Sequence, residues 1–382
     1  MSKARERQKK RRQQQEMVRR SDGRMARHQT RPQDSFQLPQ INLPGGRWLW
    51  LIPLSIVVLV AVVVVLGLIN PPDDITPPNA IWLNADWSYS EPSTETVQAL
   101  TSQFQENNIG RLFIYTSSLK ADGTWSGLVD DRNRFNEVDD RLSDLVLQIR
   151  EVAPQLELYA WVEITTTTSS GYRLDNLQIH NTIGNFSTLM VNEIGFDGVL
   201  LDVKPIFEEN EDLLTMMRSV RAKIGLDTPM LVVVPADLTP TDTSLILPAQ
   251  IAPGTEWSAE FKQRVALQAD QIVITAYNSY HTSPVDYIEW VSYQVEAFAA
   301  AMTEFDTGAT ILVSVPVYEE NLPAHDGTIE SLAGALDGVR RGVSRLELGT
   351  EMPLFAGVAI FADHRLTDSE WSIFSDKWGN QN

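Results

Sequence analysis

The sequence predicts a (β/α)8 TIM barrel preceded by one transmembrane helix, and three observations lead to this prediction. From about residue 80 onward, short apolar runs alternate with amphipathic stretches of helical length. The alternation gives eight units in about 300 residues, which fits a (β/α)8 barrel better than a doubly wound open sheet. Further upstream, residues 49–69 form an apolar segment of 21 residues without a charge.

The apolar segment is long enough to cross a bilayer once. At ~1.5 Å of rise per residue, a helix over 49–69 spans about 31 Å, close to the thickness of the hydrocarbon core. Trp48 and Trp50 lie at its start, where indole rings favour the headgroup region. We expect an uncleaved signal-anchor helix at 48–69, because a long leader precedes it; a cleaved signal peptide is the alternative.

The charge distribution predicts the orientation of this helix. Residues 1–47 contain thirteen Lys and Arg against four Asp and Glu, a net charge of +9, whereas the remaining residues carry −28. The positive-inside rule places the tail 1–47 in the cytoplasm and the acidic domain outside the cell membrane. The tail is poor in apolar residues, so we expect it to be disordered. Next to a membrane span its basic run is a topology signal, and no nucleic-acid partner is expected.

Two segments complete the expected domain organisation. Residues 70–79 are rich in proline and read as a stiff linker, and residues 80–382 form the extracytoplasmic barrel. The chain has no cysteine, no two of its five histidines have the spacing of helical metal ligands, and no glycine-rich phosphate loop is visible. We therefore expect no metal and no cofactor. The sequence leaves the oligomeric state open.

The elements of the barrel follow in order along the chain. Apolar runs bounded by polar or turn-forming residues predict strands at 80–86, 111–116, 156–164, 197–203, 230–235, 271–277, 309–317 and 354–361. Amphipathic patterns predict helices at 93–107, 136–152, 211–225 and 284–302. Ser93, Asn136 and Ser283 with Pro284 supply the expected N-caps or first turns.

The chemistry of such a barrel lies at the carboxyl ends of its strands. Those positions carry carboxylates, aromatic rings and hydroxyl groups, the mixture that a sugar-binding cleft needs. They are Asp86 and Trp87, Glu163, Asp202 and Lys204, Asp237, Tyr277 and Asn278, Tyr318 to Glu320, and Asp363 with His364.

The fourth strand carries a motif that resembles a known family. The segment FDGVLLDVKP at 196–205 is similar to the strand-4 signature of glycoside hydrolase family 18, the chitinase-like barrels, which runs Asp-Gly-apolar-Asp-apolar-Asp-x-Glu. In that family the last Glu is the general acid, and the substrate's own acetamido group is the nucleophile. Five positions of this chain match the pattern, namely Asp197, Gly198, Val199, Leu201 and Asp202.

The chain departs from this pattern at the positions that carry the chemistry. Leu200 stands where the middle Asp would be, and Lys204 stands where the acid would be. At the sixth strand the family's Met-x-Tyr-Asp becomes TAYN, which keeps Tyr277 but has Asn278 for the Asp. At the eighth strand Phe361 replaces the family's Trp. An ammonium with an ordinary pKa of about 10.4 is a poor acid for a glycosidic oxygen.

These observations predict a membrane-anchored glycoside hydrolase-like domain that binds or processes cell-surface or environmental glycans, with altered or absent hydrolase activity. The alternatives are an active glycosidase with a relocated rim carboxylate and a non-catalytic envelope scaffold protein. The candidate catalytic residues are Asp202, Lys204, Tyr277 and Glu163, and the candidate substrate-binding residues are Trp87, Asn278, Glu319 and Phe361.

Overall fold

The computed structural model describes most of the expected barrel. Its described residues are 79–120, 123–127, 135–137, 139–166, 174–238, 247, 256–304, 307–318, 320–346, 354–361 and 366–379. The predicted tail, the predicted membrane helix and nearly all of the predicted linker lie outside these ranges. Within them, no helix has both the length and the apolar character needed to span a bilayer.

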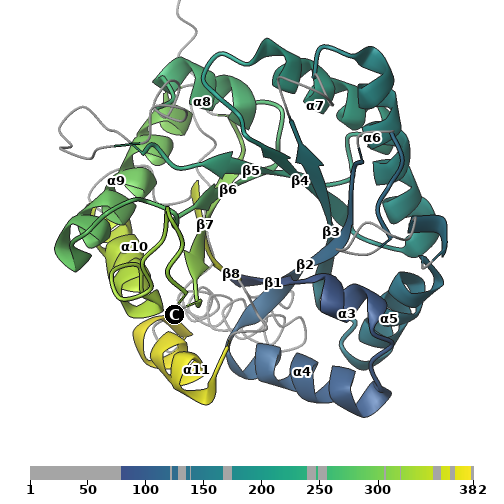
Figure 1. The fold of residues 1–382 in the computed structure, drawn as a ribbon, viewed down its shortest axis with the longest axis horizontal. Coiled ribbons are helices and arrows are strands. Elements are labelled where there is room, and N and C mark those ends of the chain that lie inside the picture. The colour runs from purple at the N-terminus through teal and green to yellow at the C-terminus, as the bar shows by residue number, and fades with distance from the viewer. Residues whose placement is uncertain are drawn as a thin grey trace, which may run out of the picture. The chain divides into compact units, whose positions relative to one another are not determined.

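Eight parallel strands close into a barrel in chain order, from β1 beside β2 to β8 beside β1 (Figure 1). The predicted (β/α)8 barrel is therefore confirmed. The strands are β1 (Asn79–Leu83), β2 (Ile109–Ser118), β3 (Glu157–Thr165), β4 (Gly198–Lys204), β5 (Met230–Pro235), β6 (Gln271–Thr275), β7 (Thr310–Pro316) and β8 (Phe355–Phe361).

All eight predicted strands are present, and the first departs most from its predicted end. The first strand was predicted to run to residue 86, but β1 ends at Leu83. Asn84 caps a short helix instead, because its side chain accepts a hydrogen bond from the backbone N–H of Asp86. The residues Ala85–Tyr89 then form helix α3, which the apolar pattern did not reveal.

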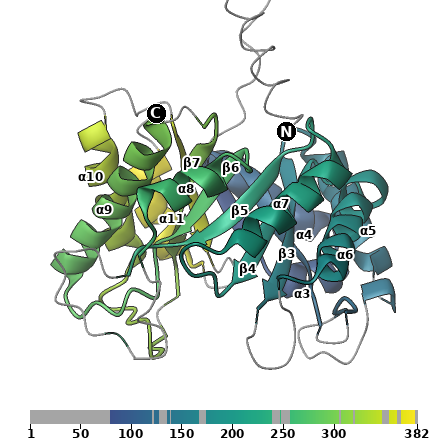
Figure 2. The same cartoon turned by 90° about the horizontal axis from the view of Figure 1, so that it is seen from above.

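The helices surround the sheet, as Figures 1 and 2 show. Besides α3 they are α4 (Thr94–Glu106), α5 (Asp139–Val152), α6 (Leu177–Leu189), α7 (Glu211–Ile224), α8 (Ala259–Ala266), α9 (Pro284–Thr303), α10 (Leu332–Leu346) and α11 (Asp368–Phe374). Short 3-10 or π-helical turns lie at η2 (Phe135–Glu137), η3 (Met190–Ile194) and η6 (Ser375–Gly379).

The predicted helix starts are correct at two of three places. Ser93 caps α4 and Ser283 caps α9, with Pro284 in the first turn of α9. The expected start at Asn136 is wrong, because that residue lies in η2 and α5 begins only at Asp139. A single 3-10 turn has little sequence signal that separates it from the first turn of an α-helix.

Alternation along each strand divides the core into two parts. One set of side chains packs inside the barrel, among them Trp82, Phe113, Leu200, Val273 and Leu312. The intervening residues face outward and pack against the helices in a larger apolar cluster. Both sides of every strand are thus covered, which is why the strands read as near-continuous apolar runs.

The amino-terminal end of the barrel is joined to the end of the described chain. The Asn79 side-chain oxygen accepts hydrogen bonds from Trp378 Nε1 at 2.8 Å and from the Val358 backbone N–H at 3.2 Å. Asn108, next to the start of β2, donates from its side-chain amide to the Gly379 carbonyl at 2.7 Å. The first and last described elements therefore lie together at the face where the strands begin.

Candidate active site

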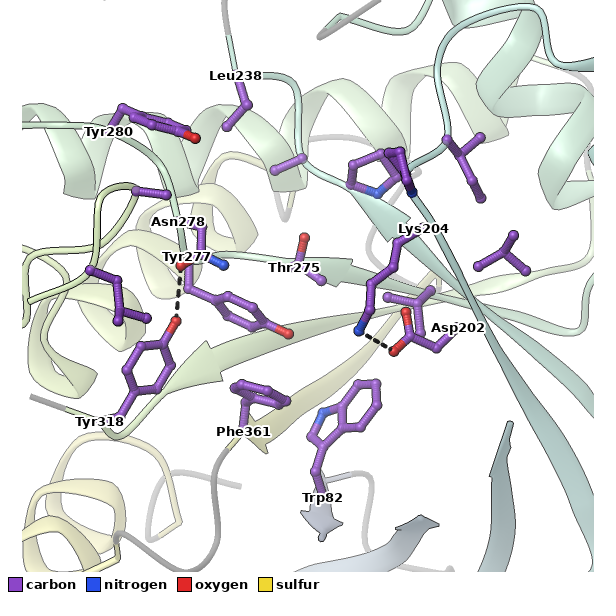
Figure 3. Close-up of a pocket in the computed structure, with 18 of the residues that line it drawn as sticks. Trp82, Asp202, Lys204, Leu238, Thr275, Tyr277, Asn278, Tyr280, Tyr318 and Phe361 are labelled. Atoms are coloured by element: carbon purple, nitrogen blue, oxygen red, sulfur yellow. Dashed lines mark hydrogen bonds and ion pairs between the residues drawn. The ribbon is translucent and has the colours of Figure 1, made fainter. Parts of the chain in front are cut away.

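A cavity of about 760 Å³ opens at the carboxyl ends of the strands, where the sequence placed the chemistry (Figure 3). Among the described residues, its lining includes side chains from β1, β3, β4, β5, β6 and β8 and from the segments that follow β4 to β7. Seven aromatic residues contribute, namely Trp82, Trp161, Phe207, Tyr277, Tyr280, Tyr318 and Phe361. The volume lies within the range that is usual for small-ligand sites.

An ion cluster occupies the wall made by β3 and β4. Lys204 Nζ lies 2.9 Å from Asp202 Oδ2 and 3.1 Å from Glu163 Oε1. The Trp161 indole N–H donates to the same Asp202 oxygen at 3.0 Å. The parallel register explains this grouping, because it sets Glu163 beside Asp202 and leaves Lys204 two residues further along the same face of β4.

The two carboxylates decide the charge state of the lysine. Burial by itself lowers the pKa of Lys204, but the nearby Asp202 and Glu163 carboxylates outweigh this effect and raise the pKa well above its ordinary value. Lys204 is therefore an ammonium at neutral pH and a hydrogen-bond donor. Asp202 is held firmly, since its side chain is only 7% exposed and accepts from both Trp161 and Lys204.

The rest of the strand-4 motif has a structural explanation. Leu200 is fully buried inside the barrel, on the same face of β4 as Asp202, so the position of the family's middle Asp is apolar here. Asp197 lies at the opposite end of the strand, where it accepts from the Leu158 N–H at 2.7 Å and pairs with Arg150 at 2.8 Å. At Gly198 an added Cβ would lie 2.3 Å from the Pro229 carbonyl oxygen, so this position requires glycine.

Tyr277 and Phe361 form one aromatic side of the cavity. Their rings stack at 4.7 Å with an interplanar angle of 14°, and Tyr318 meets Tyr277 edge-on at 6.2 Å. Burial, followed by the negative charge of Asp202, raises the pKa of the Tyr277 hydroxyl above its ordinary value. Tyr277 therefore stays neutral and can donate a hydrogen bond to a ligand.

The loop after β6 is fixed from behind by a buried carboxylate. Glu330 accepts hydrogen bonds from the backbone N–H groups of Asn278 at 2.8 Å and Ser279 at 2.9 Å, and from the Ser279 hydroxyl at 2.7 Å. His325 Nδ1 lies 2.6 Å from the same carboxylate, and its Nε2 lies 3.0 Å from the Tyr318 carbonyl. This support holds Asn278 at a φ of 58°, where its side-chain oxygen accepts from the Tyr318 hydroxyl at 3.2 Å.

Sequence reasoning did not find Glu330 and His325, although they shape the site. Both lie in the segment between β7 and α10, and neither lines the cavity. They belong to no recognised motif and do not stand directly at the end of a strand, so the sequence offered no reason to select them. The only available signal was a histidine and a glutamate close together after a strand, which is a common arrangement of loop residues.

The predicted site residues lie at different places in the structure. Asp202, Lys204, Tyr277, Asn278 and Phe361 all line the cavity, and Glu163 joins it through Lys204. Trp87 lies elsewhere, in a second cavity of about 560 Å³ that residues of α3, α4 and α11 line. Glu319 lies outside the described residues, whereas its neighbour Glu320 lines the first cavity.

One further predicted rim residue can be placed. Asp237, after β5, is buried in an ion pair with Lys262 and does not line the cavity. Throughout the described part of the chain, no group of three His, Asp or Glu residues is arranged to hold a metal ion.

Comparisons with known proteins gave matches among solved structures. No protein-family profile matches the sequence, and no curated protein matches it. Solved structures do match. The C-terminal domain of a protein described as a chitinase from Desulfitobacterium hafniense aligns at 10% identity, with a TM-score of 0.51, over 78% of this chain and 98% of that domain.

Two other solved structures also align with the chain. The spore cortex-lytic enzyme SleL of Bacillus cereus aligns at 10% identity and a TM-score of 0.49, over 78% of this chain and 73% of that one. A family 18 chitinase from Cycas revoluta, solved with allosamidin, aligns at 14% identity and a TM-score of 0.48, over 79% and 99%. The Desulfitobacterium hafniense domain thus shares the fold of this barrel.

Proposed function

We propose that this chain is a membrane-anchored, extracytoplasmic glycan-binding barrel in which chitinase-type hydrolysis is altered or absent. The observation that carries the proposal is the protonation state of Lys204. It stands at the acid position of the strand-4 motif, and Asp202 and Glu163 hold it as an ammonium. A general acid works best when its pKa lies near the working pH, and the raised pKa of this lysine moves it away from that range.

The remaining groups of the cavity suit a sugar. Trp161, Tyr277 and Phe361 offer ring faces or edges, and Asp202, Asn278 and Thr275 offer hydrogen-bonding groups beside them. A mostly apolar lining with a few fixed polar groups is the usual composition of a small-ligand site. Binding without cleavage needs these contacts and no proton donor.

The membrane anchor is proposed from the sequence alone. The uncharged segment 49–69 and the basic tail 1–47 support an anchor with the tail in the cytoplasm. Protease treatment of intact cells measures this directly: we expect the barrel to be digested and an epitope on the tail to be protected. Protection of the barrel would contradict the proposed topology.

The first experiment is turnover of fluorogenic chito-oligosaccharides and other glycosides by the full chain and by Lys204→Glu. We expect no turnover by the wild type and a gain by Lys204→Glu, because the new carboxyl group would lie on the cavity face of β4 next to Asp202. General acid catalysis contributes about 10²–10⁴-fold, which is the range of the expected gain. Binding to immobilised glycans, measured in parallel, should be present in the wild type.

Two variants serve as controls for this experiment. Lys204→Met removes the ammonium without adding an acid, and Lys223→Glu makes the same charge change on α7, where Lys223 contacts Asn185 and does not line the cavity. Neither should gain turnover. If the wild type binds none of the glycans tested, the proposed function is contradicted.

A second candidate function is an active glycosidase, because Asp202 and Glu163 lie close together beside Lys204. Asp202 and Glu163 both contact Lys204 Nζ, so the contacting oxygens lie no more than about 6 Å apart. Retaining glycosidases place their two carboxyl groups about 5–5.5 Å apart. Turnover by the wild type that Glu163→Gln or Glu320→Gln abolishes would establish this function in place of the first.

A further inference from the structure

The cavity has two chemically different parts along its depth. Its floor carries Asp202 of β4, Phe361 of β8 and Tyr277, which follows β6 by two residues. Its mouth comes from the segments after β4, β5 and β7, and the described residues there include a set of apolar side chains, namely Ile206, Phe207, Leu238, Leu322 and Ala324. We call these five residues the apolar collar. Figure 3 shows Leu238 of this collar well away from Trp82 on the floor.

The collar leaves large apolar side chains open to solvent. Phe207 is 40% exposed and Leu322 is 50% exposed, whereas Ile206 is almost fully buried. Single exposed apolar residues are normal on protein surfaces, but several at the mouth of one cavity mark a place where an apolar group binds. Sugar hydroxyl groups gain little from such a surface, because the stabilisation comes from removing apolar area from water.

We propose that the cavity takes a glycan that carries an apolar substituent, such as an alkyl or acyl chain, with the sugar on the floor and the substituent against the collar. This inference rests on the proposed glycan-binding function and narrows it to one class of ligand. The volume of about 760 Å³ leaves room for a sugar ring and an attached chain. Glu320 lines the same cavity, so a substituent with a negative charge is disfavoured there.

The chain-length dependence of binding tests the proposal. The probes are methyl, butyl, hexyl and octyl β-N-acetylglucosaminides, each below its micelle concentration, titrated against the full chain in lipid nanodiscs. We expect the affinity of the wild type to rise with chain length, by up to about fourfold for each methylene that the collar covers. The quantity to compare between variants is this slope, because the nanodisc lipid takes up the probes equally in every case.

Matched variants locate the effect. Phe207→Ser and Leu322→Ser should each lower the slope, since each removes apolar area from the collar. Leu226→Ser serves as the control, because Leu226 is 85% exposed and does not line the cavity, and it should leave the slope unchanged.

Each other outcome contradicts a different statement. If methyl and octyl glycosides bind equally well, the cavity binds sugars and the collar proposal is overturned. If octanol binds as tightly as the octyl glycoside, the sugar contributes nothing and the pairing of floor and collar is overturned. If no probe in the series binds, the collar proposal fails for this sugar. Glycan arrays then decide whether the proposed function fails as well.

Discussion

At the scale of single residues, Glu330 is the clearest example of a group that acts on the cavity from outside it. Its carboxylate is fully buried, accepts three hydrogen bonds from Asn278 and Ser279 and contacts the buried His325 ring. Buried polar groups are stable only when their hydrogen-bonding capacity is satisfied. The local conformation of the loop after β6 therefore depends on this one side chain.

We predict that Glu330→Gln lowers the free energy of unfolding by about 1–3 kcal/mol, because a neutral amide cannot accept all the buried hydrogen bonds that the carboxylate accepts. It should also weaken ligand binding, since Asn278 loses the support that fixes it. Urea unfolding measures the first effect and titration of the ligand the second. Glu296→Gln is the matched control, because Glu296 pairs with Arg345 at the surface and should change stability by less than about 1 kcal/mol. Equal effects of the two variants would contradict this assignment.

The residues of the site divide into those that a sequence can reveal and those that it cannot. Asp202, Lys204 and Tyr277 were predictable because each follows from strand alternation and from a strand end. Trp87 was a misleading candidate for the first cavity. The residues after β1 form helix α3, and Trp87 of this helix lines the second cavity. Glu330 and His325 were not predictable, since their role depends on a loop that folds back against another loop.

At the scale of elements, the pair α9 and α10 shows how the outer layer packs. The two helices lie side by side in Figures 1 and 2, and glycines of α10 face α9. A Cβ at Gly338 would lie 2.7 Å from Val291 Cβ and 2.8 Å from the Ile288 carbonyl oxygen. Glycine thus permits a close approach of the two backbones. Its low helix propensity also explains why α10 is hard to predict from sequence.

We predict opposite signs for two alanine substitutions in α10. Gly338→Ala should destabilise the barrel by about 1–2 kcal/mol, because overpacking against Val291 outweighs the gain in helix propensity. Gly334→Ala should be neutral or stabilising by up to about 1 kcal/mol, because its nearest neighbour is the movable Ser331 hydroxyl at 3.3 Å. Thermal or urea unfolding of both variants checks this. A stabilising Gly338→Ala would show that the helices can move apart without loss.

The strands were the most predictable elements, for a physical reason. A strand covered on both faces is apolar at nearly every position, so its run stands out against polar surroundings. Helix starts were predictable where a side chain caps the backbone, as at Ser93 and Ser283. The start at Asn136 was not, because a 3-10 turn there precedes the α-helix.

At the scale of the whole molecule, buried tyrosines and Lys204 act together on stability. Burial raises the pKa of Tyr89, Tyr277 and Tyr318, and the two carboxylates raise that of Lys204. In each case the folded chain holds its proton more tightly than the unfolded chain. This contribution is complete below the unfolded pKa values of about 10 and 10.4 and decreases as the pH rises above them.

We therefore predict a steep loss of stability in alkaline solution. The free energy of unfolding should be nearly constant from about pH 7 to 9 as far as these groups are concerned, and it should fall above about pH 10. Tyr277→Phe should make this fall shallower, since one group with a raised pKa is removed. Urea unfolding at a series of pH values gives the slope. A stability that rises above pH 10 would contradict the direction of these pKa shifts.

The closure of the barrel has a consequence for handling the molecule. Asn79 is hydrogen-bonded to Trp378, and Asn108 is hydrogen-bonded to Gly379. Both ends of the described barrel therefore meet at the face where the strands begin. The cavity opens at the other face, where the strands end. A barrel captured on a bead or sensor chip through either end therefore keeps its cavity turned toward the solution. Polymers too large to circulate freely can then be presented to it without obstruction from the support.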